Sequence, residues 1–257
     1  MSGISRVSSY SNYESSYGKL ASGKRLQSAS DGAADLTITQ AQDAQVTGYD
    51  TGSANMQSGK EVLNISDSVL GSISDYLQRM KELGLQASND ATVGPEDKKA
   101  IQDEIDQLKQ GITDVASNTS YNTQKLLDRS NSSFQMATDG NGNSTKVNTS
   151  DATLTTLGIK NFDVTGNFDL TTIDNALDKV NAQRSNVGAQ SNALDYQISY
   201  NSYASYNTVA SSSRLEDLDY PKAISEQKKQ ETLQLYSIYM QTNRTQQKQA
   251  QANLMFS

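Results

Sequence analysis

A regular repeat of side chains in one long segment is the feature that most constrains this fold. Between Val62 and Ala87, mostly apolar residues recur in alternating steps of four and three, without a slip. Such spacing aligns side chains in a seam along one face of an α-helix, as in a coiled coil. The sequence therefore predicts a long helix whose seam consists of Val62, Ser66, Val69, Ile73, Tyr76, Met80, Leu83 and Ala87.

The same alternation occurs in two further segments and predicts two more helices. Gly94 and Pro95 separate the first of them from the preceding helix, as in a helical hairpin, and its seam consists of Ile101, Ile105, Leu108, Ile112 and Val115. The second lies in residues 171–216 and would reach roughly 65 Å as a helix. Its frame consists of Ile173, Leu177, Val180, Val187, Leu194 and Ile198, with Arg184 and Ser191 as polar members. We expect the outgoing and returning seams to pack on each other.

Residues 129–168 differ in character from these helical segments. The run "FQMATDGNGNSTKVNTS" places turn residues between two short extended stretches, which predicts a β-hairpin. We expect a second pair of short extended runs around "LGIKNFDV", residues 157–164.

The two ends of the chain each predict an amphipathic helix. Residues 4–20 carry Ile4, Val7, Tyr10, Tyr13, Tyr17 and Leu20, and the last helix carries Ile224, Leu235, Ile238 and Tyr239. Residues 21–55 are small and polar, and their four glycines weaken a helix prediction there. The predicted fold class is therefore mainly α: an elongated helical bundle or coiled coil, with a small β-hairpin in the middle and paired terminal helices. Such terminal helices bury little by themselves and usually order when they dock on something.

Composition excludes several classes of function. The net charge of −7 argues against nucleic acid and against anionic membranes as partners, since both require a basic surface. No apolar run approaches the ~20 residues of a membrane span, and the N-terminus lacks the apolar core of a secretory signal. Cysteine and histidine are both absent, which removes disulfides, thiolate metal sites and the commonest general base. No paired acids lie in an apolar setting, so we expect neither an enzyme nor a bound cofactor or metal.

Several long stretches together resemble the bacterial flagellins. They are "LASGKRLQSASDGAADLTITQAQ" (20–42), "YLQRMKELGLQASN" (76–89), "IQDEIDQLKQGITDVASNTSYNTQKLLD" (101–128), "NVGAQSNALDYQISYN" (186–201) and "SSRLEDLDY" (212–220). The resemblance extends over nearly the whole chain. Flagellins usually insert outer domains near the hairpin, and here almost nothing intervenes, so the chain resembles a minimal flagellin.

The resemblance implies a domain organisation and a function. Residues 1–45 and 218–257 would pair as the coiled coil of an inner tube, and residues 46–217 would form an outer tube with the insert at about 129–168. The chain would be a self-assembling subunit of the extracellular flagellar filament, exported unfolded without a cleaved signal peptide. Its implied partners are further copies of itself, an export chaperone, the distal cap protein and hook-associated proteins. The alternatives are a hook–filament junction protein, a minor flagellin, or a secreted monomeric helical binding module.

The resemblance also implies candidate contact residues. In flagellins, Toll-like receptor 5 recognises the stretch around Arg79, and a neighbouring subunit would contact the same face. The residues carried over are Gln78, Arg79, Leu83, Gln86, Glu104, Ile173 and Leu177. A plain solvated helix face remains the alternative for the polar members of this set. Packing of the terminal helices is assigned to Ile4, Val7, Tyr10, Tyr17, Leu20, Leu235, Ile238 and Tyr239.

Overall fold

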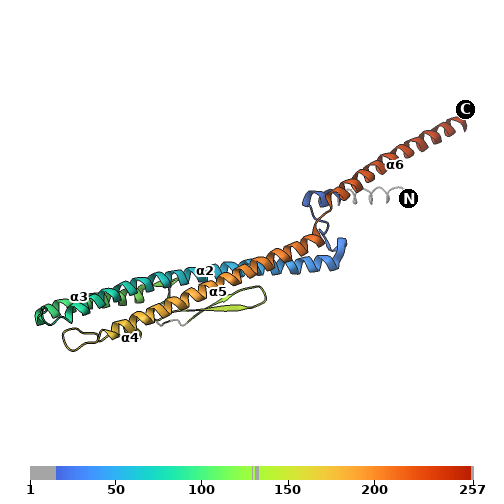
Figure 1. Cartoon of the computed structure of the whole chain (residues 1–257). Coiled ribbons are helices and arrows are strands. Elements are labelled where there is room, and N and C mark those ends of the chain that lie inside the picture. Colours follow the sequence, from blue (N-terminus) through green and yellow to red (C-terminus); the bar gives the residue numbers. More distant parts are fainter. Residues whose placement is uncertain (1–15, 129, 131–132, 256–257) are drawn as a thin grey trace. The chain divides into compact units, whose positions relative to one another are not determined.

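The computed structural model of the chain describes residues 16–128, 130 and 133–255. The predicted residues Ile4, Val7, Tyr10 and Tyr13 therefore lie outside the described part. The chain is mainly α, as predicted, and Figure 1 shows long helices with a small β element. It divides into two compact units. Unit 1 comprises the chain up to Ala44 and from Asn207 onward, and unit 2 comprises Gln45–Tyr206.

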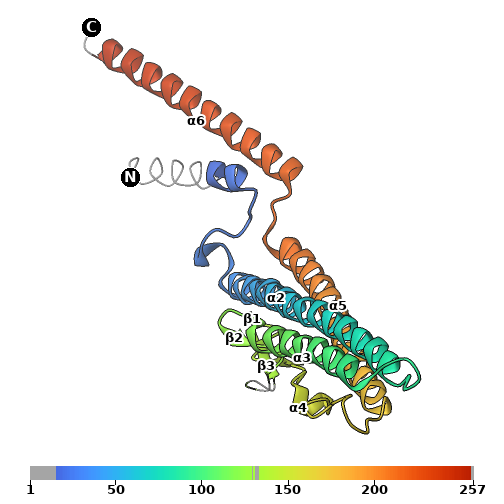
Figure 2. The same ribbon diagram turned by 90° about the vertical axis from the view of Figure 1, so that its left-hand side faces the viewer.

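Unit 2 is built on long helices that run side by side (Figure 2). They belong to α2 (Ala29–Ala87), α3 (Pro95–Asn118) and α5 (Thr171–Glu216). The three predicted helices are thereby confirmed, and α2 begins much earlier than its seam does. Helix α3 starts where proline fits best, at the first helical position, and the Asp97 carboxylate accepts a hydrogen bond from the Gly94 amide at 3.0 Å. No helix in the described residues has a stretch long and apolar enough to cross a membrane.

The core of unit 2 is formed by the predicted seams and by a second row on α2. Seam residues such as Ile73, Ile112 and Val180 are fully buried, which confirms the packing of the outgoing and returning helices. Helix α2 buries a wider face than its single heptad seam predicts. That face also includes the fully or almost fully buried Leu63, Leu70 and Leu77. A helix with neighbours on two sides needs an apolar stripe broader than a single coiled-coil seam.

The predicted β-hairpin is confirmed, whereas the second predicted strand pair is wrong. Strands β3 (Ser133–Ala137) and β4 (Ser144–Asn148) pair antiparallel, and a two-residue ladder joins β1 (Ser120–Tyr121) to β2 (Gln124–Lys125). Residues 157–164 contain no strand. The segment begins at Leu157, the last residue of the short helix α4 (Leu154–Leu157), whose start is capped by the Thr153 hydroxyl accepting from the Thr156 amide. The backbone of this segment forms turns and no strand ladder, and its apolar side chains are buried. They are Leu157, Ile159, Phe162 and Val164.

The hairpin turn packs against α2 where two glycines lie one helical turn apart. A Cβ at Gly52 would lie 1.8 Å from the Thr138 carbonyl oxygen, and one at Gly48 would lie 2.6 Å from the Gly140 nitrogen. The buried Asn201 on α5 donates to the same Thr138 oxygen at 2.7 Å. These glycines therefore permit close approach of another backbone inside a continuous helix.

In unit 1, residues 16–22 are helical and the last helix, α6 (Tyr220–Met255), is continuous. Between them, residue Lys24 forms an antiparallel bridge with Asp217. The Arg25 amide donates to the Glu216 carbonyl at 2.6 Å, and the Leu218 amide donates to the Gly23 carbonyl at 2.9 Å. The "SGKR" stretch thus ties the segment before α2 to the end of α5, and the positive φ of 72° at Gly23 suits glycine there.

Candidate functional site

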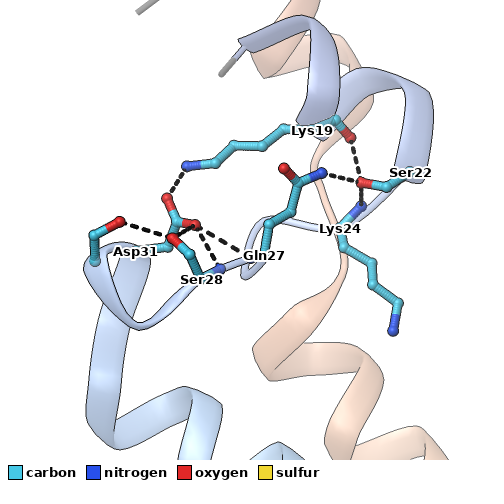
Figure 3. Close-up of polar contacts among 7 residues, drawn as sticks. Lys19, Ser22, Lys24, Gln27, Ser28 and Asp31 are labelled. Atoms are coloured by element: carbon cyan, nitrogen blue, oxygen red, sulfur yellow. Dashed lines mark hydrogen bonds and ion pairs between the residues drawn. The ribbon is translucent and has the colours of Figure 1, made fainter. Parts of the chain in front are cut away.

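Asp31 organises the polar connection between the first described helix and α2 (Figure 3). Its Oδ1 accepts from the Lys19 ammonium, and its Oδ2 accepts from the amides of Gln27 at 3.2 Å and Ser28 at 3.0 Å. The Lys19 hydrogen bond is the main cause that lowers the pKa of Asp31 to about 2, with the two amides and the Ser28 hydroxyl adding to it. A single carboxylate therefore holds the turn in which the chain enters α2.

A neighbouring ion pair joins the two chain segments that make up unit 1. The Lys24 ammonium lies 2.6 Å from a carboxylate oxygen of Glu216 on α5, and this contact raises the pKa of Lys24. Arg25 donates to the Leu215 carbonyl at 2.7 Å and to Asp35 at 3.0 Å. Side chains from both chain segments therefore stabilise the backbone bridge between Lys24 and Asp217.

Helix α6 exposes a cluster of large apolar side chains that spreads around much of its circumference. Among the predicted terminal packing residues, Leu235 is 69% exposed, Ile238 is 55% exposed and Tyr239 is 63% exposed. Leu233, Tyr236 and Met240 are exposed beside them. Of the predicted residues in the first helix, Tyr17 is exposed and Leu20 is half-buried. A long helix with so much uncovered apolar surface is marginal in isolation, and contiguous exposed apolar patches usually mark interaction sites.

In unit 2, Arg79 connects α2 to α3. Its guanidinium lies 2.8 Å from a carboxylate oxygen of Glu104 on α3 and 3.1 Å from one of Glu82 on α2. These two acids, Glu104 first, raise the pKa of Arg79. All three side chains are substantially exposed to solvent. The two acids therefore orient the Arg79 guanidinium in part. Because the pairs are exposed, they add little to the stability of the monomer.

The structure places the seven candidate contact residues in different environments. Gln78 and Gln86 are exposed with Arg79 on α2, and Leu177 on α5 is half-buried. Leu83 and Ile173 lie in the core, with exposed fractions of 2% and 0%, because both occupy seam positions. In the folded unit 2 these two side chains pack in the core below the candidate contact surface and are not part of that surface.

The candidate residues also fall on two flanks of α2. Arg79 pairs with Glu104 on α3, whereas Lys81 pairs with Asp174 on α5 at 2.5 Å. Two residues that are two positions apart point in nearly opposite directions from a helix. The Arg79 side therefore faces α3, and the α5 residues Ile173 and Leu177 belong to the other flank.

The sequence analysis missed a row of tyrosines on the exposed face of α5. This tyrosine row consists of Tyr196, Tyr200, Tyr203 and Tyr206, which are 66–78% exposed. The signal was present in "YQISYNSYASY", where the tyrosines recur in steps of four and three. Their exposure could not be predicted from this spacing, because it depends on which face of the helix packs into the core.

The exposed apolar and charged side chains described above are suited to contacts between protein surfaces. Among the described residues, no group of three or more acidic side chains could hold a metal ion. Long seam-bearing helices that carry exposed apolar side chains and surface ion pairs are typical of a structural helical protein.

Comparison with known proteins gives the family. The model of the bacterial flagellin N-terminal helical region matches residues 5–132, and that of the bacterial flagellin C-terminal helical region matches residues 170–255. The chain is 34% identical over 247 residues to a flagellin of Halalkalibacterium halodurans, covering 92% of this chain and 89% of that one. It is 31% identical to a Bacillus subtilis flagellin, covering 90% and 88%. The crystal structure of Bacillus cereus flagellin matches with a TM-score of 0.51 at 27% identity, over 58% of this chain and 88% of that one.

The chain therefore belongs to the bacterial flagellin family, whose members are structural filament proteins and not enzymes. The resemblance noted in the sequence is confirmed. The two family matches leave residues 133–169 between them, which contain the hairpin and α4.

Proposed function

We propose that this chain is exported unfolded and polymerises outside the cell into a flagellar filament used for swimming. In this proposal the terminal helices pair and become buried among neighbouring copies as an inner tube, and unit 2 forms the outer tube. The observation that carries the proposal is the exposed apolar cluster of α6, in a chain whose family forms filaments. Export would involve a chaperone, and growth would involve the distal cap and hook-associated proteins.

Polymerisation would remove this apolar cluster from water. Burial contributes roughly 25 cal/mol per Å² of apolar surface, and each large side chain offers about 1.5–3 kcal/mol. Copies that meet through different surfaces propagate an open helix and do not close into a ring. A filament built in this way repeats many modest contacts.

Deletion of residues 220–257 tests the proposal. The full chain, added to sheared filament seeds, should lengthen them in electron micrographs, and the deleted chain should not. Unit 2 of the deleted chain should retain its helical circular dichroism, because α6 lies outside that unit. Seed growth by the deleted chain would contradict the proposal. Failure of the full chain to lengthen seeds would favour a monomeric binding module, which does not polymerise.

A second proposed partner is Toll-like receptor 5, which would bind the monomer at the Arg79 flank of α2. The exposure of Gln78, Arg79 and Gln86 favours this, because exposed arginine forks and amides are suited to specific protein contacts. Receptor activation by the purified monomer, and its loss in Arg79→Ala, would test it. Activation that is unchanged in that variant would contradict it.

A further inference from the structure

We propose that the tyrosine row on α5 is a contact surface for a second copy of this chain. This inference rests on the proposed function, since it names one contact within the polymer. The row lies wholly in unit 2, and its members follow each other at steps that keep them on one side of the helix. That side is opposite to the buried Leu194 and Asn201, so the rings point away from the core.

The four tyrosine rings face solvent in the part of the chain that the structure describes. None of the four hydroxyls makes a hydrogen bond in the part of the chain that the structure describes, and the rings remain 66–78% exposed. Tyrosine carries a large apolar ring and a polar hydroxyl. It is enriched at protein interfaces, where the ring is covered and the hydroxyl forms a hydrogen bond. Four such residues in one row are unusual for a surface that faces only water.

The area of the row suits a contact between proteins. A covered tyrosine buries about 150–250 Å². Four of them at these exposures present roughly 600 Å², compared with about 800 Å² for each partner in a standard interface. The row therefore supplies most of one ordinary interface, and a filament subunit makes several.

The charge pattern points to a copy of the same chain. From Tyr196 to Ser213 the sequence has no lysine, arginine, aspartate or glutamate, although the whole chain carries a net charge of −7. Two copies of an acidic chain repel each other wherever their acids meet. An uncharged zone is where they can approach at least electrostatic cost. A basic partner would instead favour an acidic face, and nucleic acid or anionic lipid would require a basic one.

The absence of cysteine allows a direct test, because one introduced thiol is the only one in the chain. Tyr203→Cys is the test variant, and Asn141→Cys at the exposed tip of the hairpin is the matched control. Each variant is mixed as a minor fraction with the unmodified chain, and its rate of reaction with a maleimide is measured before and after seeded polymerisation. We expect the rate to fall by about tenfold or more for Tyr203→Cys and to change little for Asn141→Cys, because thiol reactivity follows access.

The outcomes separate the inference from the proposed function. Filaments in which both thiols react equally fast would overturn the inference and leave the filament assignment intact. Failure of the unmodified chain to extend seeds would overturn both. If Tyr203→Cys folds but is left out of filaments that accept Asn141→Cys, the inference is supported, and Tyr203→Phe should then enter because it keeps the ring. Protection that appears with phosphatidylcholine vesicles and without polymerisation would contradict the inference.

Discussion

Gly52 on α2 lies directly against the carbonyl of Thr138 in the hairpin turn, so closely that a Cβ at Gly52 would lie 1.8 Å from that oxygen. The contact joins the insert of unit 2 to its longest helix. The same carbonyl accepts a hydrogen bond from the buried Asn201 on α5, so three parts of the unit meet at one oxygen. Any side chain at residue 52 must move the hairpin backbone.

Gly52→Ala should therefore destabilise unit 2. Overpacking typically costs about 1–3 kcal/mol, and here the clash is with backbone atoms, so we expect a net loss of about 2 kcal/mol even after the gain in helix propensity. Urea denaturation followed by circular dichroism measures the change. Gly71→Ala in the same helix is the control, because no atom lies within 4 Å of its added methyl group, and it should stabilise by about 0.5–1 kcal/mol. Equal stability of the two variants would refute the close approach.

Asp31→Asn should loosen the turn before α2 in a pH-dependent manner. The folded pKa of Asp31, about 2, lies below its ordinary value of 3.8, so its stabilisation is fully present above pH 3.8 and is lost as the pH falls through 2. The shift corresponds to at most about 2.5 kcal/mol, which solvent screening near the surface reduces to about 1 kcal/mol. Amide hydrogen exchange at Gln27 and Ser28 measures it, because both amides donate to this carboxylate.

The control for this prediction is Asp35→Asn, which removes the same charge nearby. The Asp35 carboxylate accepts from Arg25, so its loss should leave the exchange of Gln27 and Ser28 almost unchanged. If Asp31→Asn exchanged these two amides no faster than Asp35→Asn at neutral pH, the role of Asp31 in the turn would be disproved.

Arg79→Ala should impair polymerisation while leaving the monomer folded. The guanidinium and its partners Glu82 and Glu104 are exposed, so their pairing adds little to monomer stability. The rate of seed elongation by light scattering measures the assembly effect, and the thermal midpoint measures the fold. Lys99→Ala, which breaks a comparable exposed pair with Glu96 on α3, should polymerise at the normal rate. Normal elongation by Arg79→Ala would remove Arg79 from the assembly surface.

Much of unit 2 could be predicted from the sequence, because seam positions report directly on burial. The alternation through Ile73 and Met80 specifies one covered face of α2, and both side chains are fully buried. The second row at Leu70 and Leu77 was missed because a single heptad frame describes one neighbour, whereas α2 has two.

The remaining features depend on tertiary contacts that leave no local signal. Gly48 and Gly52 weakened the helix prediction, because a sequence does not reveal that a hairpin approaches the helix there. Leu83 and Ile173 were assigned to a contact surface by family resemblance, and the same seam spacing that predicted the helices places them in the core. The spacing of the tyrosine row is visible in the sequence, but its exposure cannot be predicted from it.

We expect the apolar cluster of α6 to become buried only when copies assemble. Amide hydrogen exchange of residues 220–255, measured by mass spectrometry on the monomer and on filaments grown from it, tests this most directly. Our account predicts fast exchange in the monomer and protection by several orders of magnitude in the filament, since opening a packed helix requires much of the assembly free energy. Strong protection in the strictly monomeric chain, or fast exchange in the filament, would contradict it.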